Sequence, residues 1–252
     1  MNKVLLVLTM AALAVGAARA EESASDPSLK PDSELDQVLA AMQKAADEVK
    51  DLSADYTGFR FLADFYVSEE EAERKSGRLY FRKPEFVRLD QTTPYEKHAY
   101  VTPDRFVEYR PDTDVATLVR RDRTREREGT ETLAIAMGTS PGKLQERFTL
   151  ALVEDPQLTD EECQHLRVLE LIPKKGDLPE QAGEVVKVWL WVDTGDWLPR
   201  RVKSFEREGD YETYRLTKVR TNQGLSQRLF QFTPGPKTVI DDMTASPPQN
   251  GM

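Results

Sequence analysis

Residues 184–193 read Glu-Val-Val-Lys-Val-Trp-Leu-Trp-Val-Asp and are the most strand-like stretch of the chain. Side chains alternate between the two faces of a strand, and β-branched and aromatic residues favour extended backbone. One face should therefore carry Val186, Val188, Leu190 and Val192, and the other Val185, Lys187, Trp189 and Trp191. Both faces are apolar, whereas a sheet covered on one side is polar on its second face. Two architectures remain open: a curved sheet whose concave face lines a cavity under a few helices, and a β-sandwich with a filled core.

Short apolar stretches of strand length recur on both sides of this segment, with prolines between several of them. The predicted strands are 56–61, 78–82, 86–90, 98–101, 106–109, 115–121, 167–172, 200–206, 211–220 and 229–233. Short strands separated by close turns predict antiparallel hairpins rather than parallel βαβ units.

One long helix is predicted near the start of the domain. Ser33 can cap it, and apolar residues then recur at three- and four-residue spacing, which gives an amphipathic helix of about 17 residues. The stripe comprises Leu35, Val38, Leu39, Met42, Ala45, Ala46 and Val49. Two shorter helical pieces are expected at 132–137 and 143–150, and a turn or frayed loop at 69–73.

The ends of the chain differ from its middle. Residues 1–20 have a basic start, an apolar run and an Ala-Arg-Ala exit, so they are interpreted as a cleaved signal peptide. The apolar run is too short to span about 30 Å of hydrocarbon at about 1.5 Å per residue. Residues 21–32 should be a flexible lead-in, 33–242 one domain, and 243–252 a disordered tail.

The charge balance limits the possible partners. The 252 residues include 35 Lys and Arg against 44 Asp and Glu, a net charge of −9. Loss of the leader removes Lys3 and Arg19 and leaves a net charge of −11. An exported, soluble, periplasmic and acidic protein is expected, and nucleic acid is not an expected partner because its binding needs a basic field. The single Cys163 cannot form an intrachain disulfide, so packing must stabilise the fold.

No catalytic pattern stands out in the sequence. It has two histidines, no nucleophile elbow, no phosphate-binding loop and no dinucleotide fingerprint. We therefore expect no enzyme activity, no cofactor and no metal site. A basic run, Arg120 to Arg127, could contact an anion, a headgroup or an acidic partner, or could be a solvated edge that prevents sheet aggregation.

Four stretches in order resemble the LolA-type periplasmic lipoprotein carriers, a superfamily that also contains LolB-like and RseB-like proteins. They are 52–56; 76–86 with 94–96; 133–137 with Leu144, Phe148, Leu152 and 169–174; and 188–193 with 198–201 and 230–234. The resemblance implies an α+β, mainly antiparallel fold: an incomplete, strongly curved β-barrel with an apolar cavity covered by a lid of short α-helices. It thereby favours the cavity over the sandwich. The family usually has Arg before the proline of the second stretch, where it helps to hold the lid shut. Here Lys83 takes that place and Arg82 precedes it, so both are latch candidates.

The resemblance also implies a function. The chain should shield the acyl chains of lipoproteins in the cavity and ferry them from the inner to the outer membrane, as a monomer. An inner-membrane ABC-type transporter and an outer-membrane acceptor would be its partners. The cavity-lining candidates are Leu35, Val38, Leu39, Met42, Phe59, Phe61, Leu79, Phe81, Phe86, Leu89, Trp189 and Trp191. For each, ordinary core packing is the alternative, because the two faces of one strand cannot both point inward. Transport of another lipid or glycolipid, or a lipoprotein-sensing module, are the alternative functions.

Overall fold

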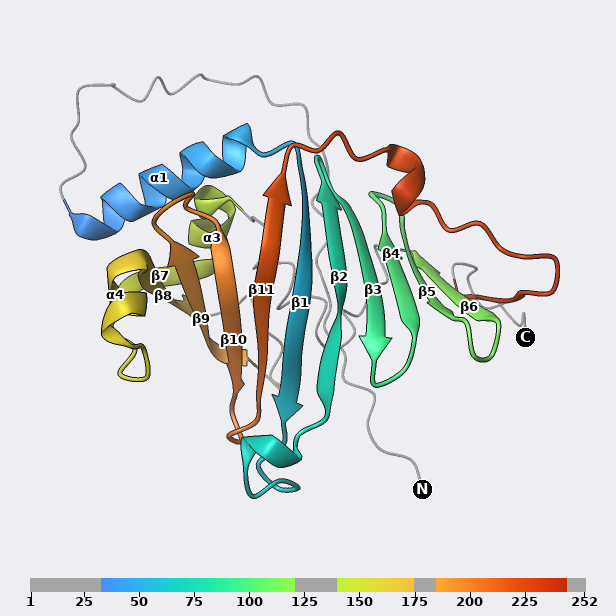
Figure 1. Ribbon diagram of the computed structural model, residues 1–252, viewed down its shortest axis with the longest axis horizontal. Helices are drawn as coiled ribbons and strands as arrows, with labels where there is room; N and C mark the ends of the chain where they lie inside the picture. The colour runs from blue at the N-terminus through green and yellow to red at the C-terminus, as the bar shows by residue number, and fades with distance from the viewer. Residues whose placement is uncertain (1–32, 121–139, 175–184, 244–252) are drawn as a thin grey trace, which may run out of the picture.

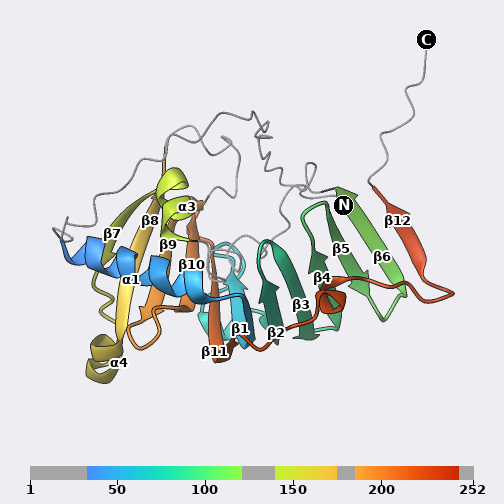
Figure 2. The same ribbon diagram turned by 90° about the horizontal axis from the view of Figure 1, so that it is seen from above.

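The computed structural model describes residues 33–120, 140–174 and 185–243, and its main feature is one curved sheet of twelve strands (Figures 1 and 2). The strands are β1 Asp51–Phe61, β2 Arg74–Arg82, β3 Phe86–Thr93, β4 Lys97–Val101, β5 Arg105–Arg110, β6 Val115–Arg120, β7 Phe148–Val153, β8 Leu166–Pro173, β9 Val185–Asp193, β10 Pro199–Glu206, β11 Tyr211–Thr221 and β12 Val239–Asp242. Their order is β12-β6-β5-β4-β3-β2-β1-β11-β10-β9-β8-β7. Neighbouring strands are antiparallel, except that β12 pairs with β6 in parallel. The predicted mainly antiparallel, incomplete barrel is therefore confirmed.

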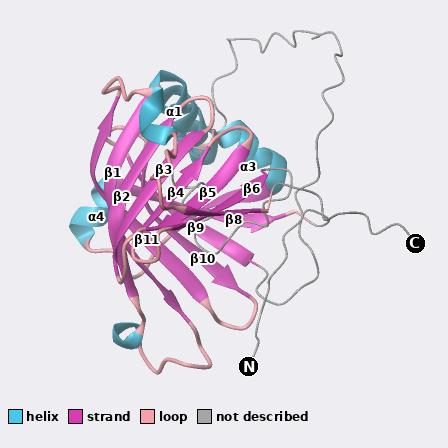
Figure 3. Cartoon of the chain, turned by 90° about the vertical axis from the view of Figure 1, so that its right-hand side faces the viewer, coloured by secondary structure: helices cyan, strands magenta, loops and turns pink. Residues whose placement is uncertain are grey.

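The few helices are short and lie outside the sheet. They are α1 Glu34–Glu48, α3 Pro141–Arg147 and α4 Asp160–His165, with 3-10 turns η1 Glu69–Glu71 and η3 Gln227–Phe230. As predicted, Ser33 caps α1: its Oγ accepts a hydrogen bond from the Asp36 N–H at 3.1 Å. Helices α1 and α3 lie at the same end of the strands and contact each other (Figures 1 and 3).

The sheet has two unlike faces. We call the face that packs against α1 and α3 the helix face, and the other the opposite face. On the helix face, side chains from β7 through β1 to β6 form one apolar cluster with α1 and α3. On the opposite face, the C-terminal segment after β11 crosses β2 and β3, where Arg82 and Arg88 donate to its carbonyl oxygens.

Strand β9 follows the predicted alternation along most of its length. Val188, Leu190 and Val192 lie on the helix face. The assignment of Val185 and Val186 was wrong: Val185 packs against the helix-face cluster, and Val186 is exposed. The cause is a bulge, because Phe205 pairs with Lys187 while the next residue of β10 pairs with Val185.

Other differences concern short segments. The helix predicted over 143–150 ends at Arg147, and Phe148 starts β7. The strand predicted over 229–233 is wrong, because part of it is η3. Helix α4 and strand β12 were not predicted. The signal peptide, the lead-in, helix 132–137, the tail beyond 243 and the basic run beyond Arg120 lie outside the described residues.

Candidate functional site

The helix face brings together seven of the twelve predicted lining residues. Val38, Leu39 and Met42 are the buried side chains of α1. The strands contribute Leu79, Phe81 and Leu89. Leu35 of α1 packs at the edge of the cluster. Register explains the grouping, because Leu79 pairs with Leu89 across β2 and β3 and therefore shares its face. This face is an apolar surface that runs under α1 and continues well beyond it.

Helix α1 is attached to the sheet at both ends by polar contacts. At its C-terminal end, the Lys83 ammonium donates to the main-chain oxygens of Ala46 at 2.6 Å and Asp47 at 3.1 Å. The Asn222 amide donates to the Glu48 oxygen at 3.1 Å. At its N-terminal end, Glu34 lies 3.4 Å from the Arg167 guanidinium. Between these ends, the contacts of α1 with the described residues of the sheet are apolar and run through Val38, Leu39 and Met42.

The two latch candidates have different positions. Lys83 contacts the last turn of α1, where carbonyl groups lack helical partners and the helix dipole favours a cation. Arg82 points to the opposite face, and its guanidinium donates to the Leu225 oxygen at 2.7 Å. Arg82 therefore holds the C-terminal segment rather than the helix.

The remaining five predicted lining residues are on the opposite face: Phe59, Phe61, Phe86, Trp189 and Trp191. Trp191 is 1% exposed, and its indole N–H donates to Asp155 at 2.9 Å. The Trp189 indole donates to Glu170 at 2.9 Å. These aromatic residues explain why both faces of β9 looked apolar in the sequence, and they lie away from α1.

Cations cover the aromatic rings of the opposite face. The Lys203 ammonium lies 3.6 Å from the centre of the Tyr211 ring, and the Arg201 guanidinium lies 4.4 Å from that of Trp191. Burial lowers the pKa of both cations. Sequence reasoning missed this layer, because Arg201 and Lys203 resemble ordinary surface charges until the strand register places them over rings.

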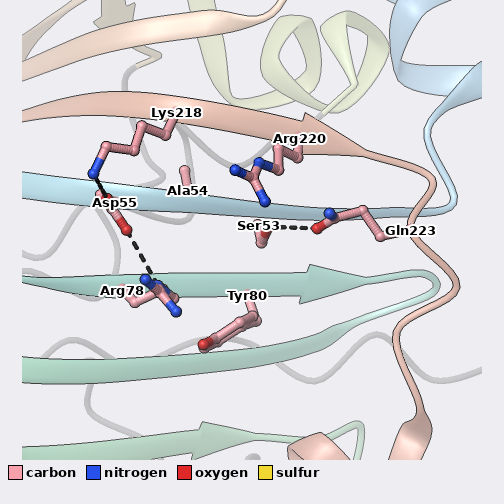
Figure 4. A pocket seen from close by; sticks show the side chains of 8 residues that line it. All are labelled: Ser53, Ala54, Asp55, Arg78, Tyr80, Lys218, Arg220 and Gln223. Carbon is pink, nitrogen blue, oxygen red and sulfur yellow. Dashed lines mark hydrogen bonds and ion pairs between the residues drawn. The ribbon is translucent and has the colours of Figure 1, made fainter.

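The same face holds a polar pocket of about 320 Å³ at the junction of β2, β1 and β11 (Figure 4). It is lined by Ser53, Ala54, Asp55, Arg78, Tyr80, Lys218, Arg220 and Gln223. The Asp55 carboxylate lies 2.8 Å from the Lys218 ammonium and 3.2 Å from Arg78 Nε. The hydrogen bond from Lys218, and after it the one from Arg78, hold the pKa of Asp55 below its usual range. The sequence offered no signal for this site, because its residues come from three strands.

Within the described ranges, no group of three or more His, Cys, Asp and Glu side chains could hold a metal ion. His98 stacks on Tyr109, and its Nδ1 lies 2.7 Å from Asp90. None of the helices in the described part of the chain is long and apolar enough to cross a membrane.

Comparison with solved structures finds distant similarities. An uncharacterized conserved protein from Thermus thermophilus matches with a TM-score of 0.51 and 12% identity, over 83% of this chain and 99% of that one. A chain of the Pseudomonas aeruginosa MucA/MucB complex matches at 0.42 and 13%, over 78% and 60%. The Mycobacterium tuberculosis lipoprotein LppX matches at 0.41 and 10%, over 77% and 99%. At 12% identity, the Thermus thermophilus match shows a shared fold alone.

Sequence comparison identifies the family. A search of curated protein sequences returned no match. The sequence model of one family, however, matches residues 48–233, which include every strand from β1 to β11. The chain therefore belongs to the family described as outer membrane lipoprotein carrier protein LolA.

Proposed function

We propose that the protein is a periplasmic carrier that shields the acyl chains of lipoproteins, or of a similar amphiphile, between α1 and the helix face. The observation that carries this proposal is the extent of the helix face. Its apolar cluster runs from β7 to β6, whereas α1 buries only Val38, Leu39 and Met42 against it. Outward movement of α1 would uncover the part of this apolar surface beneath the helix, which acyl chains could cover in its place.

The free energy gained by removing an acyl chain from water is comparable with the free energy lost when α1 leaves the sheet. A 16-carbon acyl chain in water costs roughly 12 kcal/mol at about 0.8 kcal/mol per methylene group. The three buried side chains of α1 contribute about 5–9 kcal/mol at about 1.5–3 kcal/mol each. Binding an acyl chain can therefore offset the release of the helix, and loading from a membrane can be close to thermoneutral.

The contacts of α1 suit a lid. Apolar packing is non-directional, and an acyl chain can replace it without leaving polar groups unpaired. The polar contacts lie at the two ends of the helix, at Lys83 and at the exposed pair Glu34–Arg167. We infer that Lys83 acts as the latch. Neither chemistry nor a cofactor is needed, and the direction of transport would come from the donor transporter and the outer-membrane acceptor.

Site-specific photo-crosslinking tests the proposal. A benzophenone amino acid would replace Phe81, which packs on the helix face, or Phe205, a matched aromatic residue on the opposite face. Each variant would be co-expressed in a Gram-negative host with a tagged lipoprotein, or with the same lipoprotein lacking its lipidated cysteine. Crosslinking is expected only from position 81 and only to the lipidated form.

Three outcomes would overturn the proposal: no crosslink at position 81, equal crosslinking from position 205, or equal crosslinking to the unlipidated cargo. A crosslinked complex that never delivers its cargo to the outer membrane would instead indicate a sensing module.

A further inference from the structure

The pocket between β2, β1 and β11 combines positive charge with free hydrogen-bond donors, on a chain whose net charge is −9. Arg78, Lys218 and Arg220 line it together with one carboxylate, that of Asp55. Two positive charges are therefore uncompensated inside the pocket. Such a local excess of positive charge on an acidic protein favours an anionic ligand.

The strand register explains how the cations meet. Ser53 of β1 pairs with Tyr80 on one side and with Arg220 on the other. Asp55 pairs with Arg78, and its other neighbour on β11 is Thr217. The pocket therefore lies across β1, with donors reaching in from both flanking strands (Figure 4).

A bulge in β11 is needed for this arrangement. Leu216 pairs with Tyr56 and lies on the helix face, so regular alternation would send Arg220 to that face as well. The register shifts between Thr217 and Arg220, which turns Arg220 to the opposite face and lets Val219 pack on the helix face.

The bulge places a lysine in an unfavourable backbone conformation. Lys218 has a φ of 50°, in the left-handed region that favours glycine. A non-glycine residue there costs roughly 1–2 kcal/mol. Glycine would suit the backbone better, so the lysine is best explained by its side chain, which reaches Asp55 at the pocket.

Donor groups remain available in the pocket. Arg220 has no hydrogen-bond or ion-pair partner within the part of the chain that the structure describes. Arg78 binds Asp55 through Nε and also bonds the Tyr80 side chain, which leaves the rest of its N–H groups. The Gln223 oxygen accepts from Ser53 at 2.6 Å, so the amide N–H₂ of Gln223 is left to donate.

We propose that this pocket binds a phosphate group, either free or as part of a lipid headgroup. Two guanidinium groups, an ammonium and an amide offer more donors than the two oxygens of a carboxylate accept, whereas a phosphate presents three or more acceptor oxygens. The site is on the face away from α1, and it does not depend on acyl-chain binding at the helix face.

The test uses two variants of the full chain and one control. Lys218→Gly removes a cation and keeps a residue that tolerates positive φ, so the bulge should survive. Arg220→Gln removes the unpartnered guanidinium. Arg110→Gln is the control, because Arg110 is an exposed arginine bonded to Asp112 at the far side of the sheet. Urea unfolding of each variant would check that it folds.

The first probe is inorganic phosphate, titrated at constant ionic strength against chloride, with acetate as a carboxylate competitor. The readout is the chemical shift of the arginine Nε–H groups. We expect wild type and Arg110→Gln to respond with equal affinity, and Lys218→Gly and Arg220→Gln to bind at least about tenfold more weakly. No response in wild type, an unchanged affinity in Arg220→Gln, or equal binding of acetate would overturn the proposal.

The second probe distinguishes the two sources of phosphate. Vesicles of phosphatidylcholine with phosphatidylglycerol would be sedimented with each variant. Binding that inorganic phosphate displaces and that Arg220→Gln loses would assign the site to a lipid headgroup. A phosphate response without vesicle binding would assign it to a soluble phosphate.

Discussion

The ammonium group of Lys83 lies 2.6 Å from the main-chain oxygen of Ala46, in the last turn of α1. Lys174 makes the same kind of contact with α3, where its ammonium donates to the Gln145 oxygen at 2.6 Å. Both helices of the helix face thus have a lysine from a neighbouring strand or strand end at the C-terminal end of their dipole. These contacts stabilise each helix end without occupying the apolar surface between the helix and the sheet.

Replacing Lys83 with Met should loosen α1. The variant keeps the length of the side chain and removes the charge that binds two carbonyl groups, at a cost of about 0.5–1 kcal/mol. Amide hydrogen exchange across α1 should become about two- to fivefold faster. Lys44→Met is the matched control, because Lys44 is an exposed residue of the same helix. Equal exchange in the two variants would contradict the latch.

Removing the hydroxyl of Tyr214 should destabilise the sheet. It donates to the buried Glu212 carboxylate at 2.6 Å, and the second contact of that carboxylate is with Lys75 at 3.2 Å. Tyr214→Phe should therefore lower the free energy of unfolding by about 1.5–3 kcal/mol. Urea unfolding at pH 7 measures it, and a loss below about 0.5 kcal/mol would show that the bond contributes little.

The same tyrosine predicts a loss of stability in alkali. Burial raises the pKa of Tyr214 well above its ordinary value, and the pKa of Tyr56 is also raised by burial. Their neutral forms are therefore favoured in the folded state, while both ionise near pH 10 in the unfolded chain. The contribution of these groups to the free energy of unfolding is fully present below about pH 10. Above that pH it falls by about 1.4 kcal/mol per pH unit for each group. Tyr214→Phe should reduce this slope, as urea titrations from pH 9 to 11.5 would show; an unchanged slope would contradict it.

Asp51 should control the docking of the C-terminal segment. Its buried carboxylate accepts the N–H groups of Gln223, Gly224 and Leu225 at 2.7–3.1 Å. Asp51→Ala leaves these donors unpaired, so we expect a loss of about 3 kcal/mol and faster cleavage by trypsin after Arg228. Asp241→Ala, at an exposed position of β12, is the control. Equal cleavage of the two variants would show that Asp51 does not hold the segment.

Gly77 should not tolerate a side chain. A Cβ at this position would lie 2.0 Å from the Asp90 main-chain oxygen on the adjacent strand. Gly77→Ala is expected to cost at least about 2 kcal/mol. Gly142→Ala, in α3 with open space around it, should be neutral or stabilising by about 0.5–1 kcal/mol. Thermal unfolding compares the two, and equal melting temperatures would refute the steric argument.

Periodicity predicted the strands well where pairing was regular, as in 188–192 of β9. It failed at Val186, where one residue changes the register, because this bulge carries no glycine that would reveal it. Phe148 was predicted as helical because it follows Leu144 by four residues, a spacing that also fits a helix, yet it starts β7. The Phe-Gln-Phe pattern at 230–232 suggested a strand, yet Phe230 packs on Phe86 and Phe232 on Tyr109.

The candidate site was predictable from the sequence only where local spacing determines which face a residue occupies. The stripe of α1 follows from spacing alone, so Val38, Leu39 and Met42 were found together. The side of the sheet on which Phe59 or Trp189 lies depends on partners distant in sequence. The polar pocket depends on the pairing of β1 with β2, on the pairing of β1 with β11, and on the bulge in β11. No local sequence pattern encodes these three features.

The pairing of Ser53 with Arg220 has a consequence for how the molecule is assembled. The first strand obtains β2 as a neighbour soon after it is synthesised, but its other edge stays empty until almost the whole domain has been made. Long-range strand pairing of this kind is slow to form. A nascent chain therefore remains without the pairing of β1 and β11, at the centre of its sheet, until synthesis is nearly complete.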